Sequence, residues 1–209
     1  MKKMMMAPLL ACMMAFTSVG AYAQAVDSSQ PDALIKTVTT EVMNEAKSDS
    51  SVQSGDIGRI TQLVNQKILP YTDFERTTQL TMGRYWRQAT PAQRQQVTEQ
   101  FKTLLIRTYS GAIAQIRNQT VQYLPFRGQD GASDAVVRTQ VNNNGQPVEL
   151  DYRLTKTAQG WRVYDINVLG AWLIQAYQQQ FAQQIQQNGI DGLIRFLTTR
   201  NQQLANGNG

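Results

Sequence analysis

The segment that most constrains this chain is 161–185, where the spacing of apolar residues changes from a strand pattern to a helix pattern. Residues 161–168 alternate strand-forming side chains, and Gly170 then predicts a bend. Past the bend, apolar residues recur every three or four positions, as on one face of an amphipathic helix. That face comprises Leu173, Ile174, Tyr177, Phe181 and Ile185. We therefore expect a strand that leads directly into a helix folded back over the sheet.

The space between that strand and that helix would be lined by aliphatic and aromatic side chains. A cavity for a hydrophobic cargo needs such a lining, and an ordinary protein core needs the same one. The pattern alone leaves both structures open.

The beginning of the chain has the three parts of a secretory signal peptide. Lys2 and Lys3 form a basic start, 4–16 is an apolar run too short to span a bilayer comfortably, and 21–23 is an Ala-Tyr-Ala cleavage motif. We therefore predict a signal peptide at 1–23 and export of the remainder. A lipid anchor on Cys12 is the alternative, but the apolar run continues past that cysteine to the cleavage motif.

The predicted mature chain, 24–209, contains no cysteine and no histidine. No disulfide can hold its fold, so a hydrophobic core must suffice, and a chain of this length can bury one. Catalysis by Ser-His-Asp or Cys-His groups is excluded, as are metal sites built from His or Cys. We expect one domain at 24–204, a disordered tail at 205–209, and no enzymatic activity, catalytic residue, metal or cofactor.

Helices precede the strands along the chain. The expected helices, besides the one within 161–185, lie at 32–48, 57–68, 73–86, 91–118 and 191–204, with Asp73 and the Thr90–Gln93 pair as caps. The expected strands lie at 120–126, 135–142, 148–155 and 161–168, with Asn144-Gly145 as a hairpin turn. This order predicts an α+β fold: an antiparallel meander sheet with helices packed on one face, enclosing an apolar cavity.

Acidic side chains offer little for catalysis. Asp73 and Glu75 form one close pair, in which Asp73 is better explained as a helix cap. Glu149 and Asp151 form the other, on the polar face of a strand, where a solvated surface is the simpler explanation.

Basic residues are concentrated in one part of the chain. Between positions 76 and 127 there are eight lysines or arginines and one acid, Glu99. They form either a solvated helix surface or a contact surface for phosphate groups, on lipid head groups or on an acidic partner. The candidates for this contact are Arg76, Arg84, Arg87, Arg94 and Lys102.

Two stretches of sequence carry a family resemblance. The first contains Pro-Tyr-Thr-Asp-Phe at 70–74, Gly-Arg-Tyr-Trp at 83–86, Thr-Pro-Ala-Gln at 90–93, Phe-Lys-Thr-Leu-Leu at 101–105, and Tyr109. The second contains Gly-Trp-Arg-Val-Tyr-Asp-Ile at 160–166, followed by Gly170, Tyr177 and Phe181. With the predicted signal peptide and the helix-then-sheet order, this pattern resembles the MlaC family, also called toluene-tolerance proteins.

The resemblance implies a periplasmic phospholipid carrier that shuttles lipid between the outer and inner membranes and so maintains outer-membrane lipid asymmetry. It implies a deep apolar cavity for the acyl chains, with phospholipid as cargo rather than cofactor. The implied partners are an outer-membrane lipoprotein complex and an inner-membrane MCE-domain ABC transporter. Contact with membranes would be transient. We expect no nucleic-acid partner, because the chain is predicted to be exported. A periplasmic chaperone or protein-interaction module without lipid cargo is the alternative.

The apolar residues fit the demands of lipid transport. A two-chain phospholipid carries roughly 30 methylene groups, so bare transit through water would cost roughly 24 kcal/mol, at about 0.8 kcal/mol per group. A soluble carrier must cover nearly all of that surface. The candidate lining residues are Phe101, Leu105, Tyr109, Val141, Leu150, Tyr152, Val163, Ile166, Leu173 and Tyr177.

Overall fold

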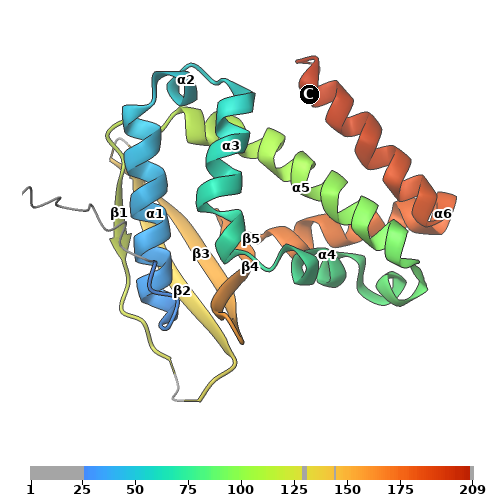
Figure 1. Ribbon diagram of the computed structural model, residues 1–209, viewed down its shortest axis with the longest axis horizontal. Helices are drawn as coiled ribbons and strands as arrows, with labels where there is room; N and C mark the ends of the chain where they lie inside the picture. Colours follow the sequence, from blue (N-terminus) through green and yellow to red (C-terminus); the bar gives the residue numbers. More distant parts are fainter. Residues whose placement is uncertain (1–25, 129–130, 144, 208–209) are drawn as a thin grey trace, which may run out of the picture.

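The computed structural model describes residues 26–128, 131–143 and 145–207, so the predicted signal peptide and Asn144 lie outside the described residues. The helices are α1 (Pro31–Ser48), α2 (Ser50–Gln53), α3 (Ile57–Lys67), α4 (Phe74–Met82), α5 (Pro91–Ala114) and α6 (Leu173–Ala205), with two 3-10 helices, η1 (Leu69–Tyr71) and η2 (Gly83–Gln88). The strands are β1 (Thr120–Tyr123), β2 (Asp134–Asn143), β3 (Gln146–Thr157), β4 (Gly160–Val168) and β5 (Ala171–Trp172). Figure 1 shows the sheet at one side of the molecule, beside α1, and the long helices α5 and α6 extending away from it.

The sheet is an antiparallel meander in the order β1-β2-β3-β4-β5, which confirms the predicted α+β fold class. Asn143 pairs with Gln146, so β2 and β3 are joined where the hairpin was expected. β1 ends at Tyr123, three residues before the predicted end, and the two-residue β5 was not predicted. Both differences concern short edge strands, where few hydrogen bonds and little burial mark the sequence.

An irregularity between β3 and β4 decides which side chains share a face. Leu154 pairs with Val163 and Tyr152 pairs with Ile166, with a register shift at Arg153/Leu154. Val163 and Ile166 are three residues apart, so regular alternation would put them on opposite faces. The shift adds one residue on β4, as a β-bulge does, and both side chains contribute to the same apolar cluster.

Predicted caps begin two of the helices. The Asp73 side chain accepts a hydrogen bond from the Arg76 backbone N–H at the start of α4. Thr90 and Gln93 form a complete capping box at the start of α5, with Pro91 at the first helical position. These contacts satisfy backbone N–H groups that have no partner within the helix, which fixes where each helix begins.

Three apolar clusters hold the described part of the chain together. One, which we call the helical cluster, joins α4, η2, α5 and α6 through residues such as Phe101, Phe181 and Leu193. A second, the sheet cluster, joins α1 to the sheet through residues such as Leu34, Tyr152 and Trp161. A third joins α1, α2 and α3 to the far end of α5. Because α5 contributes to two of these clusters, it is buried on more than one side.

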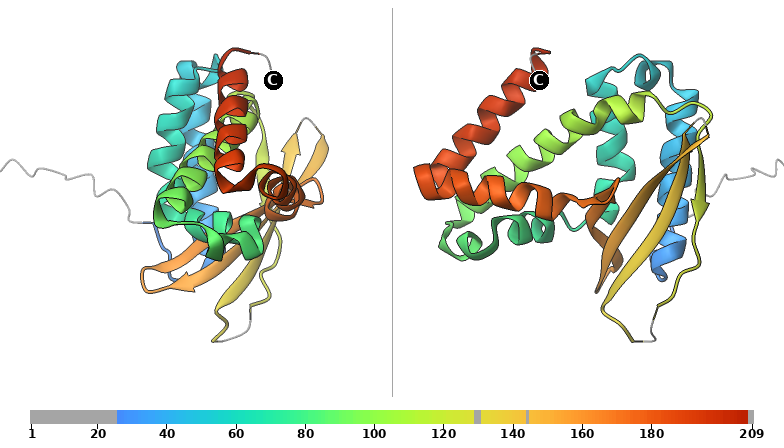
Figure 2. Two further views of the ribbon diagram at one scale, coloured as in Figure 1. Left: turned by 90° about the vertical axis from the view of Figure 1, so that its right-hand side faces the viewer. Right: turned by 180° about the vertical axis from the view of Figure 1, so that it is seen from behind.

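Helix α6 changes direction at Gly189, between the two helices expected within 161–185 and at 191–204. Gly189 has φ 69° and ψ −179°, a backbone conformation that is almost exclusive to glycine. Beyond it the helix continues to Ala205, and Leu204 packs against the helical cluster. Figure 2 shows this C-terminal half turning back beside α5.

Replacing Gly189 with alanine should destabilise the protein. The alanine either adopts a strained backbone or straightens α6 and withdraws Leu193 and Leu197 from the core, at a cost of about 1–3 kcal/mol. Thermal unfolding followed by circular dichroism measures this loss. The matched control is Gly111→Ala, because Gly111 is helical, has open space around its Cβ position and should gain about 0.5–1 kcal/mol. Equal melting temperatures for the two variants would contradict the assigned kink.

In the described part of the chain, no helix combines the length and the apolar character needed to cross a membrane.

Candidate functional site

Four aromatic rings meet where α4, α5 and α6 approach one another. The Phe101 ring centroid lies 5.6 Å from Phe74, 5.1 Å from Tyr177 and 4.9 Å from Phe181. The contacts of Phe101 with Tyr177 and Phe181 are edge-to-face, a geometry that favours aromatic packing beyond the area it buries. Phe101 and Phe181 are fully buried, whereas Tyr177 is half-buried. Tyr177 therefore stands between the apolar cluster and solvent, and burial raises the pKa of its hydroxyl.

The structure divides the predicted lining residues into two groups. Phe101, Leu105 and Tyr177 belong to the helical cluster. The sheet cluster contains four others, Leu150, Tyr152, Val163 and Ile166. Apolar spacing identified residues that face inward, but it could not separate a helix–helix interior from a helix–sheet interior.

Three further predicted residues lie outside both clusters. Leu173 is buried at the first position of α6, directly after β5. Val141 is half-buried on β2, between Val121 of β1 and Val148 of β3. Tyr109 is half-buried on α5, and burial raises its pKa.

A hollow of about 400 Å³ lies between α5 and the first half of α6. Its walls include Tyr109 and Tyr177, so it opens beside the aromatic cluster. The remaining lining residues are Ala176, Gln179, Gln180 and Gln183. The arrangement combines two aromatic side chains with a polar rim and carries no charged group. It can receive an apolar group that enters from solvent between the two helices.

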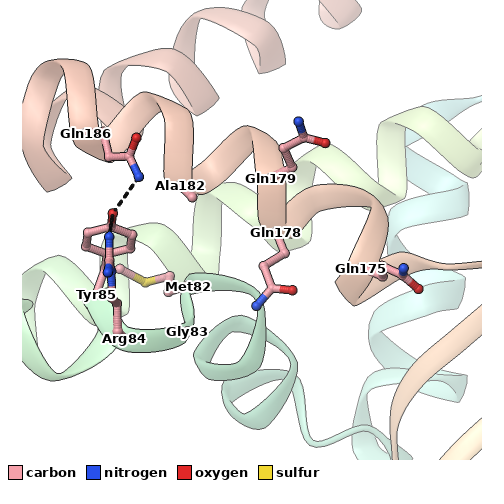
Figure 3. A pocket seen from close by; sticks show the side chains of 9 residues that line it. All are labelled: Met82, Gly83, Arg84, Tyr85, Gln175, Gln178, Gln179, Ala182 and Gln186. Carbon is pink, nitrogen blue, oxygen red and sulfur yellow. Dashed lines mark hydrogen bonds between the residues drawn. The ribbon is translucent and has the colours of Figure 1, made fainter.

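A second hollow, of about 550 Å³, lies on the η2 side of α6. Figure 3 shows Arg84 stacked along Tyr85, and Gln186 of α6 pointing at the Tyr85 hydroxyl. The Tyr85 hydroxyl accepts hydrogen bonds from Arg84 Nη2 at 2.9 Å and from Gln186 Nε2 at 3.0 Å. The Arg84 contact is the main reason that the pKa of Tyr85 is lowered.

The five basic candidates do not form one free patch. Arg76 is held by the sheet, through an ion pair with Asp134 at 2.9 Å and a hydrogen bond to Thr155. Arg94 donates to the Trp86 carbonyl and lies over the Trp86 ring, so it braces η2 against α5.

The other three basic candidates differ in exposure. Lys102 pairs with Glu99 on the same helix, at 2.5 Å. Arg87 and Arg84 are exposed on η2. Charge counting could find the excess in this region but could not show that Arg76 and Arg94 are already engaged within the fold.

Sequence reasoning missed Asp165, which ties β4 to α6. Asp165 is 2% exposed, and its carboxylate accepts hydrogen bonds from the backbone N–H groups of Ile166 and Ile174 and from the Arg153 guanidinium. Burial raises its pKa, against the opposing effect of these three donors. The guanidinium of Arg153 also lies 3.8 Å from the centroid of the Trp172 ring. One sequence signal could have revealed it: Asp165 is the one acidic residue in the strand-forming run 161–168. It lies nine residues before Ile174, whose backbone N–H it accepts.

Within the described residues there is no group of three or more His, Cys, Asp or Glu side chains that could hold a metal ion. The site therefore consists of an aromatic cluster, two hollows on either side of α6, and a few basic side chains. These features define an α+β protein whose candidate site presents apolar and polar side chains together.

Comparison with known proteins gives the family. The family model described as "MlaC protein" matches residues 36–199, so this chain belongs to the MlaC family. A "Toluene tolerance protein ttg2D" of Pseudomonas putida is 27% identical over 167 residues, which cover 79% of this chain and 78% of that protein. An "Intermembrane phospholipid transport system binding protein MlaC" of Haemophilus influenzae is 22% identical over 174 residues, which cover 81% of each.

A solved structure agrees with the family. It is the phospholipid-binding protein from Ralstonia solanacearum in complex with a phospholipid. It is 52% identical in sequence and matches this structure with a TM-score of 0.83, over 85% of this chain and 99% of that one.

Proposed function

We propose that this protein is a phospholipid carrier of the periplasm. The observation that carries the proposal is its similarity, at 52% identity, to a protein solved with a bound phospholipid. The relatives named as a toluene tolerance protein and as a phospholipid transport binding protein support the same role. In this role the chain binds a phospholipid, hides its acyl chains from water and performs no chemistry on it, with no metal or cofactor.

The helical cluster suits the acyl chains. Phe101 and Phe181 supply a fully buried aromatic surface, and Tyr177 and Tyr109 bring apolar area to the hollow beside it. Leaving the two acyl chains in water would cost roughly 24 kcal/mol, which is large compared with the stability of a typical domain, so the carrier must cover them throughout transit. A lipid taken from a bilayer is already hidden from water, so any helix contacts that open to admit it must be replaced by contacts with the acyl chains.

Uptake from vesicles tests this function. Protein stripped of lipid and incubated with phospholipid vesicles should acquire lipid that native mass spectrometry detects after the vesicles are removed. A chaperone without lipid cargo would instead suppress aggregation of an unfolded client and remain lipid-free. That second result would overturn the carrier proposal.

The cargo must pass to and from membranes, so docking partners are part of the proposal. The partners proposed are an outer-membrane lipoprotein complex and an inner-membrane MCE-domain ABC transporter, with export by the predicted signal peptide. The ATP-driven step would belong to the transporter. Arg87 and Lys102 are the candidates for this contact. Arg87 is exposed, and Lys102 pairs with Glu99 one turn away on its own helix, whereas Arg76 and Arg94 are held by other elements of the fold.

Reversing the charge of Arg87 and Lys102 together, to glutamate, should weaken docking and leave bound lipid in place. The loss should shrink as salt rises, because exposed charges are screened over about 10 Å at 0.1 M ionic strength. Surface plasmon resonance against an immobilised partner or anionic bilayer measures the docking affinity at low and high salt. The matched control reverses Lys36 on α1 and Arg138 on β2, both exposed. Equal losses in both double variants would point to net charge and contradict a defined docking surface.

A further inference from the structure

The larger hollow combines one cation with several neutral polar groups. It lies between the start of η2 and the first half of α6, has a volume of about 550 Å³ and opens to solvent. Its lining residues are Met82, Gly83, Arg84, Tyr85, Gln175, Gln178, Gln179, Ala182 and Gln186. None of these described lining residues is acidic, and the one formal charge among them is the guanidinium of Arg84.

Arg84 and Tyr85 are arranged to bind an anion. Arg84 lies over the Tyr85 ring, 5.0 Å from its centroid, and donates through Nη2 to the Tyr85 hydroxyl. That hydroxyl also accepts from Gln186, so its own proton is directed elsewhere and is available to a ligand. Arg84 retains further N–H donors in the planar fork that suits phosphate oxygens.

The rest of the rim suits hydroxyl groups. The side chains of Gln178 and Gln179 present both donors and acceptors, the pairing that a polyol requires. Gln178 Nε2 would lie 3.5 Å from a Cβ atom added to Gly83, and Gly83 has φ +55°. That distance is ordinary van der Waals contact, so glycine at this position is explained by its positive φ at the junction of α4 and η2.

The floor of the same hollow is apolar. Met82 and Ala182 line it, and both belong to the cluster that contains Phe101 and Phe181. A molecule held at the polar rim thus lies directly above the apolar interior. This combination fits an amphiphile better than a freely soluble sugar.

We propose that this hollow binds an anionic phosphoglycerol group, with Arg84 and the Tyr85 hydroxyl contacting the phosphate and the glutamine side chains contacting the glycerol hydroxyls. The inference rests on the proposed carrier function and adds a head-group class to it. The group can come from the head group of the cargo lipid or from a free glycerol phosphate ester.

Lipid selection tests the first source. Stripped protein is incubated with vesicles of equimolar phosphatidylglycerol and phosphatidylcholine, and the bound lipid is quantified by mass spectrometry. We expect the wild type to enrich phosphatidylglycerol about threefold to fivefold, the scale of one partly exposed charge contact. Arg84→Gln should bring the ratio close to one, because a cation favours the net negative head group of phosphatidylglycerol over the zwitterionic one of phosphatidylcholine. Arg138→Gln, at an exposed arginine on β2, should not change the ratio.

Titration with sn-glycerol 3-phosphate tests the second source. Backbone amide shifts of η2 and α6 should respond in the wild type and in Arg138→Gln, and not in Arg84→Gln. A response in this titration without any lipid selection would assign the site to the free ester. Tyr85→Phe retains the buried ring, so it tests the hydroxyl even if Arg84→Gln loses stability.

Failure of this inference differs from failure of the carrier function. Protein that loads lipid fully, with the same composition in wild type and Arg84→Gln and no amide response to the ester, overturns the phosphoglycerol site alone. Protein that loads no lipid overturns the carrier function.

Discussion

Tyr177→Glu should yield a folded protein that has lost most of its bound lipid. Tyr177 is half-buried and borders the 400 Å³ hollow between α5 and α6, so the new carboxylate can reach water in the empty protein. The loss of ring contacts with Phe101 and Phe181 should cost about 1–2 kcal/mol, or roughly 2–8 °C in melting temperature. A bound acyl chain would exclude that water and leave a charge in apolar surroundings, which is strongly unfavourable.

Phe181→Glu is the matched comparison. Phe181 lies four residues further along α6 in the same aromatic cluster, but it is 0% exposed. A carboxylate there has no route to solvent, and removal of a buried phenylalanine alone costs about 3–5 kcal/mol. This variant should therefore unfold at a far lower temperature or fail to fold.

Circular dichroism combined with lipid extraction separates the possible results. Two similarly unfolded variants would mean that the region around Tyr177 is solid core. A Tyr177→Glu protein that stays folded and fully loaded would show that Tyr177 does not contact the cargo.

Asp165→Ala should also have a large effect, on both stability and loading. The substitution removes the acceptor for the N–H groups of Ile166 and Ile174 and for Arg153. We expect a loss of about 3 kcal/mol, because two buried donors lose their partner while Arg153 can turn to solvent. Lipid loading should fall as well, since the start of α6 is no longer fixed to β4. Glu149→Ala, at an exposed acid on β3, should stay within about 0.5 kcal/mol of the wild type.

The raised pKa of Asp165 gives a second way to test its environment. Because burial favours the protonated form in the folded protein, the stability that the group contributes is fully present below the ordinary aspartate pKa of about 4 and is lost as pH rises through the raised value. Asp165→Asn does not titrate, so the wild type should lose stability relative to this variant as pH rises across that interval. Denaturant titrations at several pH values measure the free energy of unfolding of both proteins. A wild type that gains stability relative to the variant as pH rises would contradict net desolvation of this carboxylate.

Much of the fold followed from sequence because its signals are local. The period change at Gly170, the Thr90–Gln93 capping box and the break at Gly189 each depend on neighbouring residues, and each is present in the structure. The functional surfaces depend instead on contacts between distant segments. Tyr85 meets Gln186 across 101 positions, and Arg76 meets Asp134 across 58, so neither contact leaves a local pattern.

The predicted lining illustrates the same limit. Periodicity placed Phe101 and Tyr152 on inward faces correctly, but it could not assign them to different clusters, one between helices and one between α1 and the sheet. The shared face of Val163 and Ile166 depends on an irregular register that pairing with β3 imposes. Cluster membership and shared faces are decided by how whole helices and strands pack, which residue type alone does not encode.

The carrier function is tested most directly by native mass spectrometry of protein purified from a periplasmic extract, with organic extraction of the same sample. We predict about one phospholipid per chain, released by extraction and recovered when the stripped protein meets vesicles. Protein that is lipid-free as isolated, and that takes up no phospholipid from vesicles while fully folded, would contradict this function.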